Sequence, residues 1–135
     1  MFTSDTILDL YENENHLKLS IKELLSVANL DSLKFKSFEG YVSIKDIIKI
    51  GTTNVCKINK KLRCSFETKF LIKKDDPLLF YEIHHLKNNS VISKTDKVIP
   101  IKSVEDCGSH FVYDFKIDKS HYFLDSYVIG KNSLI

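Results

Sequence analysis

The chain has 135 residues, 43% of them hydrophobic, and a formal charge of +2 at neutral pH. Such a chain is expected to fold as one domain with an apolar core, and its nearly balanced charge gives no reason to expect a nucleic-acid partner. Its three cysteines, Cys56, Cys64 and Cys107, include no C-x-x-C pair, which argues against a disulfide framework or zinc site and favours a reducing, cytoplasmic location. No apolar run reaches the roughly 18 residues of a membrane span, so we expect no membrane partner. We also expect a monomer.

The N-terminal residues predict a hairpin followed by a short helix. Apolar and polar residues alternate from about Thr6, a polar turn follows at 12–15, and the alternation resumes up to Ser20. Ser20 lies three residues before Glu23, which is the spacing of a capping box. We therefore expect a short helix over residues 21–27.

The rest of the chain predicts an all-β fold of short, mostly antiparallel strands, with one or two short helices in total. Residues 78–86 fit a short helix or a strand about equally, and the polar residues 87–96 predict a mobile surface connection. Pro100 is tolerated in a strand only at an edge or a bulge. The expected strands cover residues 33–36, 41–50, 55–65, 70–72, 97–105 and 111–117, with turns at 37–40, 51–54 and 106–109 and two final short strands beside 119–120 and 125–126.

The C-terminal segment carries the most distinctive chemistry in the sequence. Asn132 directly precedes the hydroxyl residue Ser133. A suitably held Asn can attack its own backbone carbonyl, close a succinimide ring and release the peptide that follows. Taken alone, however, such a pair is an ordinary turn or tail.

Four of the five histidines have no spacing that indicates chemistry, and we interpret them as ordinary polar residues. The adjacent His84 and His85 could mimic a pair of metal ligands, but no third ligand is spaced to join them. We therefore interpret this pair, too, as ordinary polar residues and not as a metal site.

Residues 112–123, Val-Tyr-Asp-Phe-Lys-Ile-Asp-Lys-Ser-His-Tyr-Phe, resemble the C-terminal splicing blocks of inteins. The pattern of that family is an apolar residue before Tyr-Asp, an alternating strand, a His with an aromatic residue two positions later, and an Asn before Ser, Thr or Cys. Here the pattern runs without a gap through Asp114 and His121 to Asn132 and Ser133. A match at so many points is specific for a short motif.

The N-terminal part of the chain shows the same resemblance. Residues 2–7 and 21–25 look like the first intein block, in which residue 1 is Cys or Ser. Residues 62–71 look like the next block, whose Thr-x-x-His pattern falls on Ser65 and Thr68. The resemblance covers the whole chain and implies the Hint fold, a compact all-β horseshoe that brings the termini together.

The resemblance implies a self-splicing mini-intein over residues 1–132, with residues 133–135 as the start of the C-extein. The chain is too short for the homing endonuclease domain of larger inteins. Ser133-Leu-Ile resembles the continuation of the Asp-Thr-Asp-Ser motif of family B DNA polymerases, which indicates a host of that kind. The implied partners are the flanking extein polypeptides of the chain itself, and the implied chemistry needs neither a metal nor a cofactor.

Roles for individual residues follow from the same resemblance. Residue 1 would attack the carbonyl that precedes it, Ser133 would accept the upstream extein, and Asn132 would cyclise. His121 is the implied general acid or base. Asp114 stands where the family has a carboxylate that couples the two ends of the reaction.

Three positions depart from the family pattern. Met1 carries no nucleophile, and we interpret it as a start residue in place of a native Cys or Ser, rather than as the mark of a degenerate copy. Thr68 stands where the family has His; Thr68 and Ser65 can hydrogen-bond the first scissile peptide without carrying its proton. Lys131 stands where many members have a second His, and it either donates to the Asn132 carbonyl or lies in solvent.

Two alternatives stay open. One is a cleavage-only domain of the hedgehog-like or bacterial intein-like kind, which releases a C-terminal piece without ligation. The other is a small, non-catalytic β-domain that binds a protein or nucleic acid, for which the sequence shows no basic or apolar patch.

Overall fold

Strands dominate the computed structural model, which describes residues 1–87 and 90–132. In these ranges one short α-helix, α1 (Ile21–Leu24), and one 3-10 turn, η1 (Ile83–His85), interrupt a chain of antiparallel strands, which confirms the predicted all-β class. The strands are β1 (Ile7–Glu12), β2 (Asn15–Ser20), β3 (Leu33–Ser37), β4 (Gly40–Ile58), β5 (Leu62–Ser65), β6 (Lys69–Lys73), β7 (Leu79–Glu82), β8 (Val91–Ser93), β9 (Val98–Pro100), β10 (Val104–Ile117), β11 (His121–Leu124) and β12 (Tyr127–Gly130).

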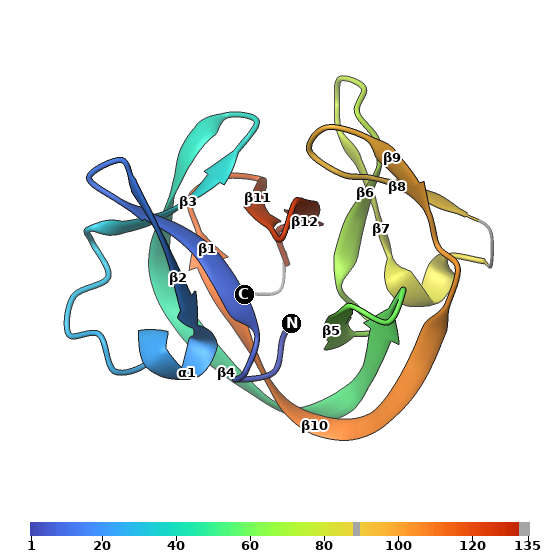
Figure 1. Ribbon diagram of the computed structural model, residues 1–135, viewed down its shortest axis with the longest axis horizontal. Helices are drawn as coiled ribbons and strands as arrows, with labels where there is room; N and C mark the ends of the chain where they lie inside the picture. Colours follow the sequence, from blue (N-terminus) through green and yellow to red (C-terminus); the bar gives the residue numbers. More distant parts are fainter. Residues whose placement is uncertain (88–89, 133–135) are drawn as a thin grey trace.

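Strands β4 and β10 organise the molecule, since they pair along most of their length and run together beneath both halves (Figure 1). They contain 19 and 14 residues, so the expectation of short strands throughout is wrong for these two. The turns expected at residues 51–54 and 106–109 lie inside these strands. The glycine and polar residues that predicted turns instead mark β-bulges.

The pairing register of β4 and β10 shifts at three places. Two of the shifts coincide with Gly51 and Gly108, whose φ angles of 119° and 77° suit glycine far better than other residues. At the second, the Asp106 carboxylate accepts the N–H of Gly108 at 2.8 Å. Because each bulge bends its strand and increases the local twist, the paired strands curve into a horseshoe (Figure 1).

An arm rises from each end of the curved pair. The first is a sheet in the order β10-β4-β3-β1-β2, and the second combines the sheet β11-β12-β6-β7 with the hairpin β8-β9. Figure 1 shows the two arms facing each other, with the N-terminus between them. Strand β11 contacts β3 and β1 as well as its own sheet, so the arms share one core.

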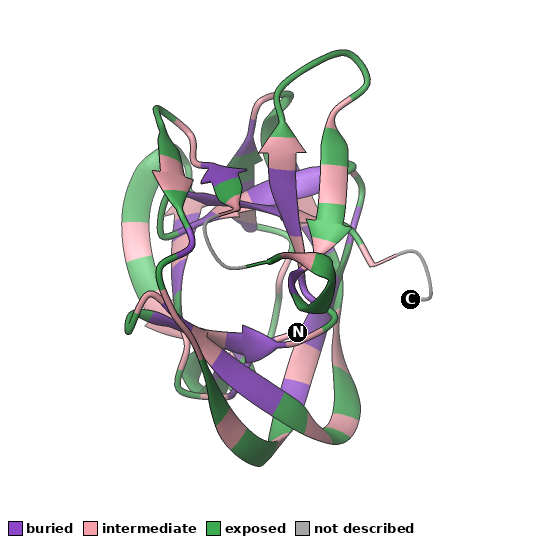
Figure 2. Cartoon of the chain, turned by 90° about the vertical axis from the view of Figure 1, so that its right-hand side faces the viewer, coloured by how far each residue is buried: buried purple, intermediate pink, exposed green. Residues whose placement is uncertain are grey.

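Aromatic rings fill the part of the core where β11 meets the first arm. Phe35 stacks on Tyr122 with ring centroids 4.4 Å apart, and it meets Phe115 edge-on at 5.1 Å. Such a pair contributes about 0.5–1.5 kcal/mol beyond its buried area. The three side chains are almost fully buried, and in Figure 2 buried segments lie inside the molecule while the hairpin tips are exposed.

The local predictions are partly confirmed. Ser20 and Glu23 form the expected capping box, with reciprocal hydrogen bonds of 3.0 and 2.9 Å, although α1 ends at Leu24 and not at residue 27. Residues 78–86 combine both options, because β7 leads directly into η1. Pro100 lies in a two-stranded sheet, as the edge rule predicts.

The expectation of a mobile surface connection over residues 87–96 is wrong for β8, which lies in this segment. Ile92 is fully buried there and Ser93 is nearly so, while Val91 is exposed, so the single apolar side chain of Ile92 is enough to anchor a short strand against β6. No helix in the described ranges is long and apolar enough to cross a membrane.

Candidate functional site

Backbone hydrogen bonds hold the first two residues between β10 and β5. Phe2 is fully buried and exchanges two backbone hydrogen bonds with Tyr113 of β10, at 2.9 and 2.8 Å. Ser65, the last residue of β5, donates its N–H to the Met1 carbonyl at 2.9 Å. Residue 1 therefore has a fixed position between the two arms.

Thr68 lies between β5 and β6 and contacts residue 1 directly. Its Oγ1 accepts a hydrogen bond from the Met1 amine at 3.1 Å and lies 3.4 Å from the Met1 carbonyl oxygen, to which it can donate. The Ser65 Oγ is 3.0 Å from the same Oγ1, and both residues are buried. The structure thus brings together three of the predicted site residues, with the Thr68 hydroxyl against the residue 1 nitrogen and the Ser65 hydroxyl against that of Thr68.

The Met1 amine is enclosed even though the residue as a whole is only half-buried. Burial lowers the pKa of this amine below its ordinary value of 8.0, because the charged form loses its hydration. The negative charge of Asp114 opposes this effect and raises the pKa. Asp114 therefore acts electrostatically on the N-terminal end of the site.

Asp114 also contacts the C-terminal end of the site. The residue belongs to β10 and is 6% exposed, and its Oδ1 accepts the N–H of Phe115 at 2.8 Å. Its other oxygen, Oδ2, lies 3.5 Å from the Nδ2 of Asn132, which can donate to it. The carboxylate predicted to couple the two ends thus lies between them.

A single pocket contains both ends of the described chain. Met1, Thr68, Asp114 and Asn132, all predicted site residues, line it. The sequence did not indicate its remaining lining residues, which are Glu67, Lys69, Ile129 and Gly130. They come from the turn before β6, from β6 and from β12, and only the sheet pairing of β6 with β12 places them here.

His121 begins β11 and is fully buried, one strand pairing away from Gly130 of the pocket. Its Nε2 accepts the N–H of Phe38 at 3.0 Å, so in the neutral ring the proton resides on Nδ1, which donates to the Ser120 Oγ at 2.8 Å. Burial lowers the pKa of His121, which favours this neutral form. The ring is not among the residues lining the pocket, so its predicted role at Asn132 stays a prediction.

Lys131 is exposed and does not line this pocket, but it lines a neighbouring one that shares Lys69 and Gly130 with it. Its backbone N–H donates to the Ser120 carbonyl at 2.8 Å, which fixes the chain just before Asn132. The predicted nucleophile Ser133 and the expected C-extein residues 133–135 lie outside the described residues.

Two buried cysteines border the N-terminal half of the site. Cys56 and Cys64 are direct partners across β4 and β5, and Cys64 precedes Ser65. Burial raises the pKa of the Cys64 thiol well above its ordinary value, so this thiol is protonated at neutral pH. Cross-strand partners have no fixed sequence spacing, and the sequence therefore gave no signal for this pair.

The expectation that no third ligand joins His84 and His85 is wrong. The carboxylate of Glu82, the last residue of β7, contacts His84, and one ligand atom from each of the three residues lies within 4.8 Å of the others. The spacing argument failed because it did not include the change from strand to 3-10 turn between Glu82 and Ile83.

No protein-family profile and no curated protein sequence matches this chain. Its fold, however, matches those of solved inteins. The VidaL intein (selenomethionine variant) has a TM-score of 0.79 at 15% identity, with 96% of this chain and 94% of that chain covered. A DnaB intein from Synechocystis sp. PCC 6803 has a TM-score of 0.73 at 13% identity, with 97% of each chain covered. An intein from a hyperthermophile has a TM-score of 0.75 at 15% identity, with 96% of this chain and 98% of that chain covered.

The matches to solved inteins and the geometry of the chain indicate the same architecture. Coverage is nearly complete for each of the three chains, so the likeness extends over the curved β4–β10 pair and both arms. At such low identity it is the fold that is established. The chain has the all-β Hint fold of the inteins, with residues 1 and 132 at one pocket.

Proposed function

We propose that the chain is a self-splicing mini-intein in which Met1 occupies the position of the first nucleophile, so that the chain as it stands cannot start the reaction. One observation carries this proposal: Met1 and Asn132, at opposite ends of the domain, line one pocket with Thr68 and Asp114. The fold shared with solved inteins supports it. The substrate and partner would be the chain's own flanking polypeptides.

In the first step a Cys or Ser at residue 1 attacks the carbonyl carbon of the preceding residue. A thioester or ester forms, the old peptide bond breaks, and the residue 1 nitrogen becomes a free amine by taking up a proton. Thr68 Oγ1 lies 3.1 Å from that nitrogen, so its hydroxyl would hold the scissile peptide in place. The thioether of Met1 has no proton to lose and is not a nucleophile of this kind.

In the later steps the Ser133 hydroxyl takes over the acyl group, and Asn132 then cyclises. The Asn132 Nδ2 attacks its own main-chain carbonyl carbon, and the Ser133 nitrogen leaves as an amine. This reaction is limited by how well the carboxamide is held, since reacting groups kept in position gain most of their rate from orientation. The contact of Asn132 Nδ2 with Asp114 Oδ2 supplies such a restraint.

We assign His121 the role of general acid at the C-terminal step. Its lowered pKa and its bond with the Phe38 N–H both favour the neutral ring, which has no proton ready for the leaving Ser133 amine. Cyclisation would therefore be slow until a rearrangement frees Nε2. In this proposal the first steps of splicing bring about that rearrangement, and Lys131 contributes by hydrogen-bonding the Asn132 carbonyl.

A cleavage-only domain is the second candidate. It is favoured by one observation, that Asn132 already contacts Asp114 although residue 1 is no nucleophile. Such a domain would release the C-terminal segment without joining the two flanks.

The test is a precursor with a folded reporter domain on each side of the chain and the substitution Met1→Cys, whose products are identified by intact mass. Splicing predicts a ligated product of the two reporters, absent in the matched precursor that retains Met1 and in the double variant Met1→Cys, Asn132→Ala. Free reporters without ligated product would favour the cleavage-only candidate. A precursor that keeps its full mass would refute both candidates and leave the non-catalytic binding domain.

A further inference from the structure

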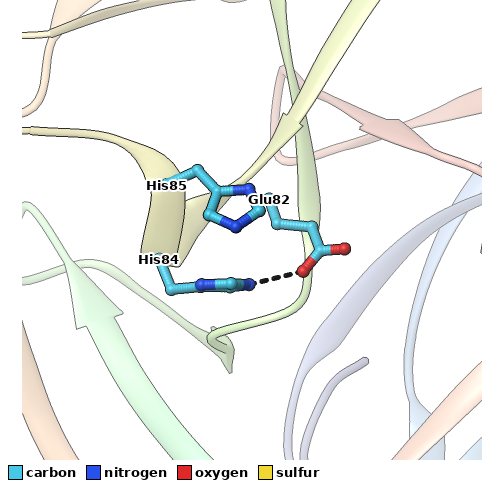
Figure 3. A group of neighbouring side chains, drawn as sticks. All are labelled: Glu82, His84 and His85. Atoms are coloured by element: carbon cyan, nitrogen blue, oxygen red, sulfur yellow. Dashed lines mark hydrogen bonds and ion pairs between the residues drawn. The ribbon is translucent and has the colours of Figure 1, made fainter.

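Glu82, His84 and His85 form a cluster at the end of β7 and in η1, and none of the three lines the pocket described above. Figure 3 shows their side chains gathered beside the turn from β7 into η1. The His84 Nε2 lies 2.5 Å from the Glu82 Oε1, and the two imidazole rings have centroids 3.9 Å apart at an angle of 54°. Glu82 is half-buried and both histidines are exposed, so an ion can reach all three from solvent.

The backbone that carries the cluster is held firmly. Between the three residues, Ile83 is buried and donates its N–H to the Thr68 carbonyl at 3.0 Å. His84 donates its N–H to the Phe66 carbonyl at 3.1 Å. Glu82 pairs with Lys69 across β7 and β6. The three side chains therefore start from fixed positions, and little ordering is needed to bring their ligand atoms together.

Chemistry distinguishes this cluster from an ordinary ion pair. The contact between Glu82 and His84 does not involve the His85 ring, whose centroid lies 3.9 Å from that of His84. One divalent ion can instead bind two neutral imidazoles and the carboxylate at once. Two His and one acidic residue are a recurrent set of three protein ligands for Zn²⁺, with water in the open position, and imidazole also suits Ni²⁺ and Cu²⁺.

We propose that Glu82, His84 and His85 bind a divalent transition-metal ion such as Zn²⁺, with one ion per chain. The site does not depend on the splicing proposal, because its three residues do not line the pocket of Met1 and Asn132. It is connected to that pocket through the hydrogen bond from Ile83 to Thr68. Loss of splicing in a test of the first proposal would thus leave the metal site standing, and loss of metal binding would leave splicing standing.

The experiment is calorimetric titration of the untagged chain with Zn²⁺ and, separately, with Ni²⁺. Wild type is compared with the single variants His84→Ala, His85→Ala and Glu82→Gln. His16→Ala is the matched control, because His16 is also exposed and contacts a carboxylate, Asp9, at 3.0 Å. A second control, Cys107→Ser, removes the partly exposed thiol as an alternative zinc ligand. Loss of even an outer-shell partner typically costs about 10- to 100-fold in metal affinity, so each ligand variant should bind at least about tenfold more weakly, and the controls should bind like wild type.

Amide chemical shifts of the wild-type chain give a second readout that needs no variant. Zn²⁺ should shift the signals of residues 82–86 most strongly and EDTA should restore them. The proposal is overturned if wild type shows no saturable binding of either ion. It is equally overturned if Cys107→Ser abolishes binding, or if the three ligand variants bind like wild type and the shifts appear elsewhere.

Discussion

Thr68 should hold residue 1 in place, and the substitution Thr68→Val measures how strongly. Valine has nearly the same shape but no hydroxyl, so the variant loses the hydrogen bond with the Met1 amine and leaves the buried Ser65 hydroxyl without the Thr68 oxygen. A net hydrogen bond is worth about 1 kcal/mol, and an unsatisfied buried polar group costs about 1–3 kcal/mol. We expect the free energy of unfolding to fall by about 2–4 kcal/mol, less than the roughly 5–15 kcal/mol of a typical domain.

The assay is urea denaturation followed by far-UV circular dichroism. Thr52→Val, on an exposed position of β4, is the matched control and should change the free energy of unfolding by no more than about 0.5 kcal/mol. Removing both hydroxyls in Ser65→Ala, Thr68→Val should cost less than the sum of the single variants, because no unpaired hydroxyl remains. Equal losses for Thr68→Val and Thr52→Val, or strict additivity in the double variant, would refute the reasoning.

Three further predictions concern the same core. Burial lowers the pKa of the Met1 amine in the folded chain, so the unfolded chain binds a proton there more readily. The free energy of unfolding should therefore rise with pH up to about 8 and level off above it. Urea titrations at several pH values should show this rise, and N-terminal acetylation should abolish it. Tyr122→Phe removes a buried hydroxyl that has no partner among the described residues, and thermal and urea unfolding should show a gain of about 1 kcal/mol, against no change for the exposed Tyr41→Phe. Gly130→Ala places a Cβ 2.9 Å from the Phe80 ring, and the same measurements should show a loss of about 1–3 kcal/mol.

The sequence predicted the parts of the fold that depend on neighbouring residues. Alternation gave the β1–β2 hairpin, and the spacing of Ser20 and Glu23 gave the capping box. Gly51 and Gly108 show the limit, because a glycine beside polar residues has the same signature in a turn and in a bulge. Only the partner strand decides between the two, and the partner lies dozens of residues away.

For the site, too, the sequence predicted some contacts and missed others. The resemblance predicted that Met1, Thr68, Asp114 and Asn132 meet, and the structure places them at one pocket. It did not predict that the His121 ring holds the N–H of Phe38, because that contact joins residues 83 positions apart. The third member of the Glu82 cluster was missed for a local reason, since the exact point where a strand becomes a 3-10 turn leaves no clear trace in composition.

The central claim is that the two ends of the chain form one site with Asp114 between them. It is tested most directly by Asp114→Asn in the flanked Met1→Cys precursor, with the exposed Asp96→Asn as control. The substitution keeps an oxygen for the Phe115 N–H and replaces the acceptor that faces Asn132 by a donor. Mass spectrometry over time measures thiol-induced release at residue 1 and cyclisation at Asn132 in the same sample. The account predicts that both rates fall together in Asp114→Asn and neither falls in Asp96→Asn, whereas a normal yield of ligated product from Asp114→Asn, or loss at one end alone, would contradict it.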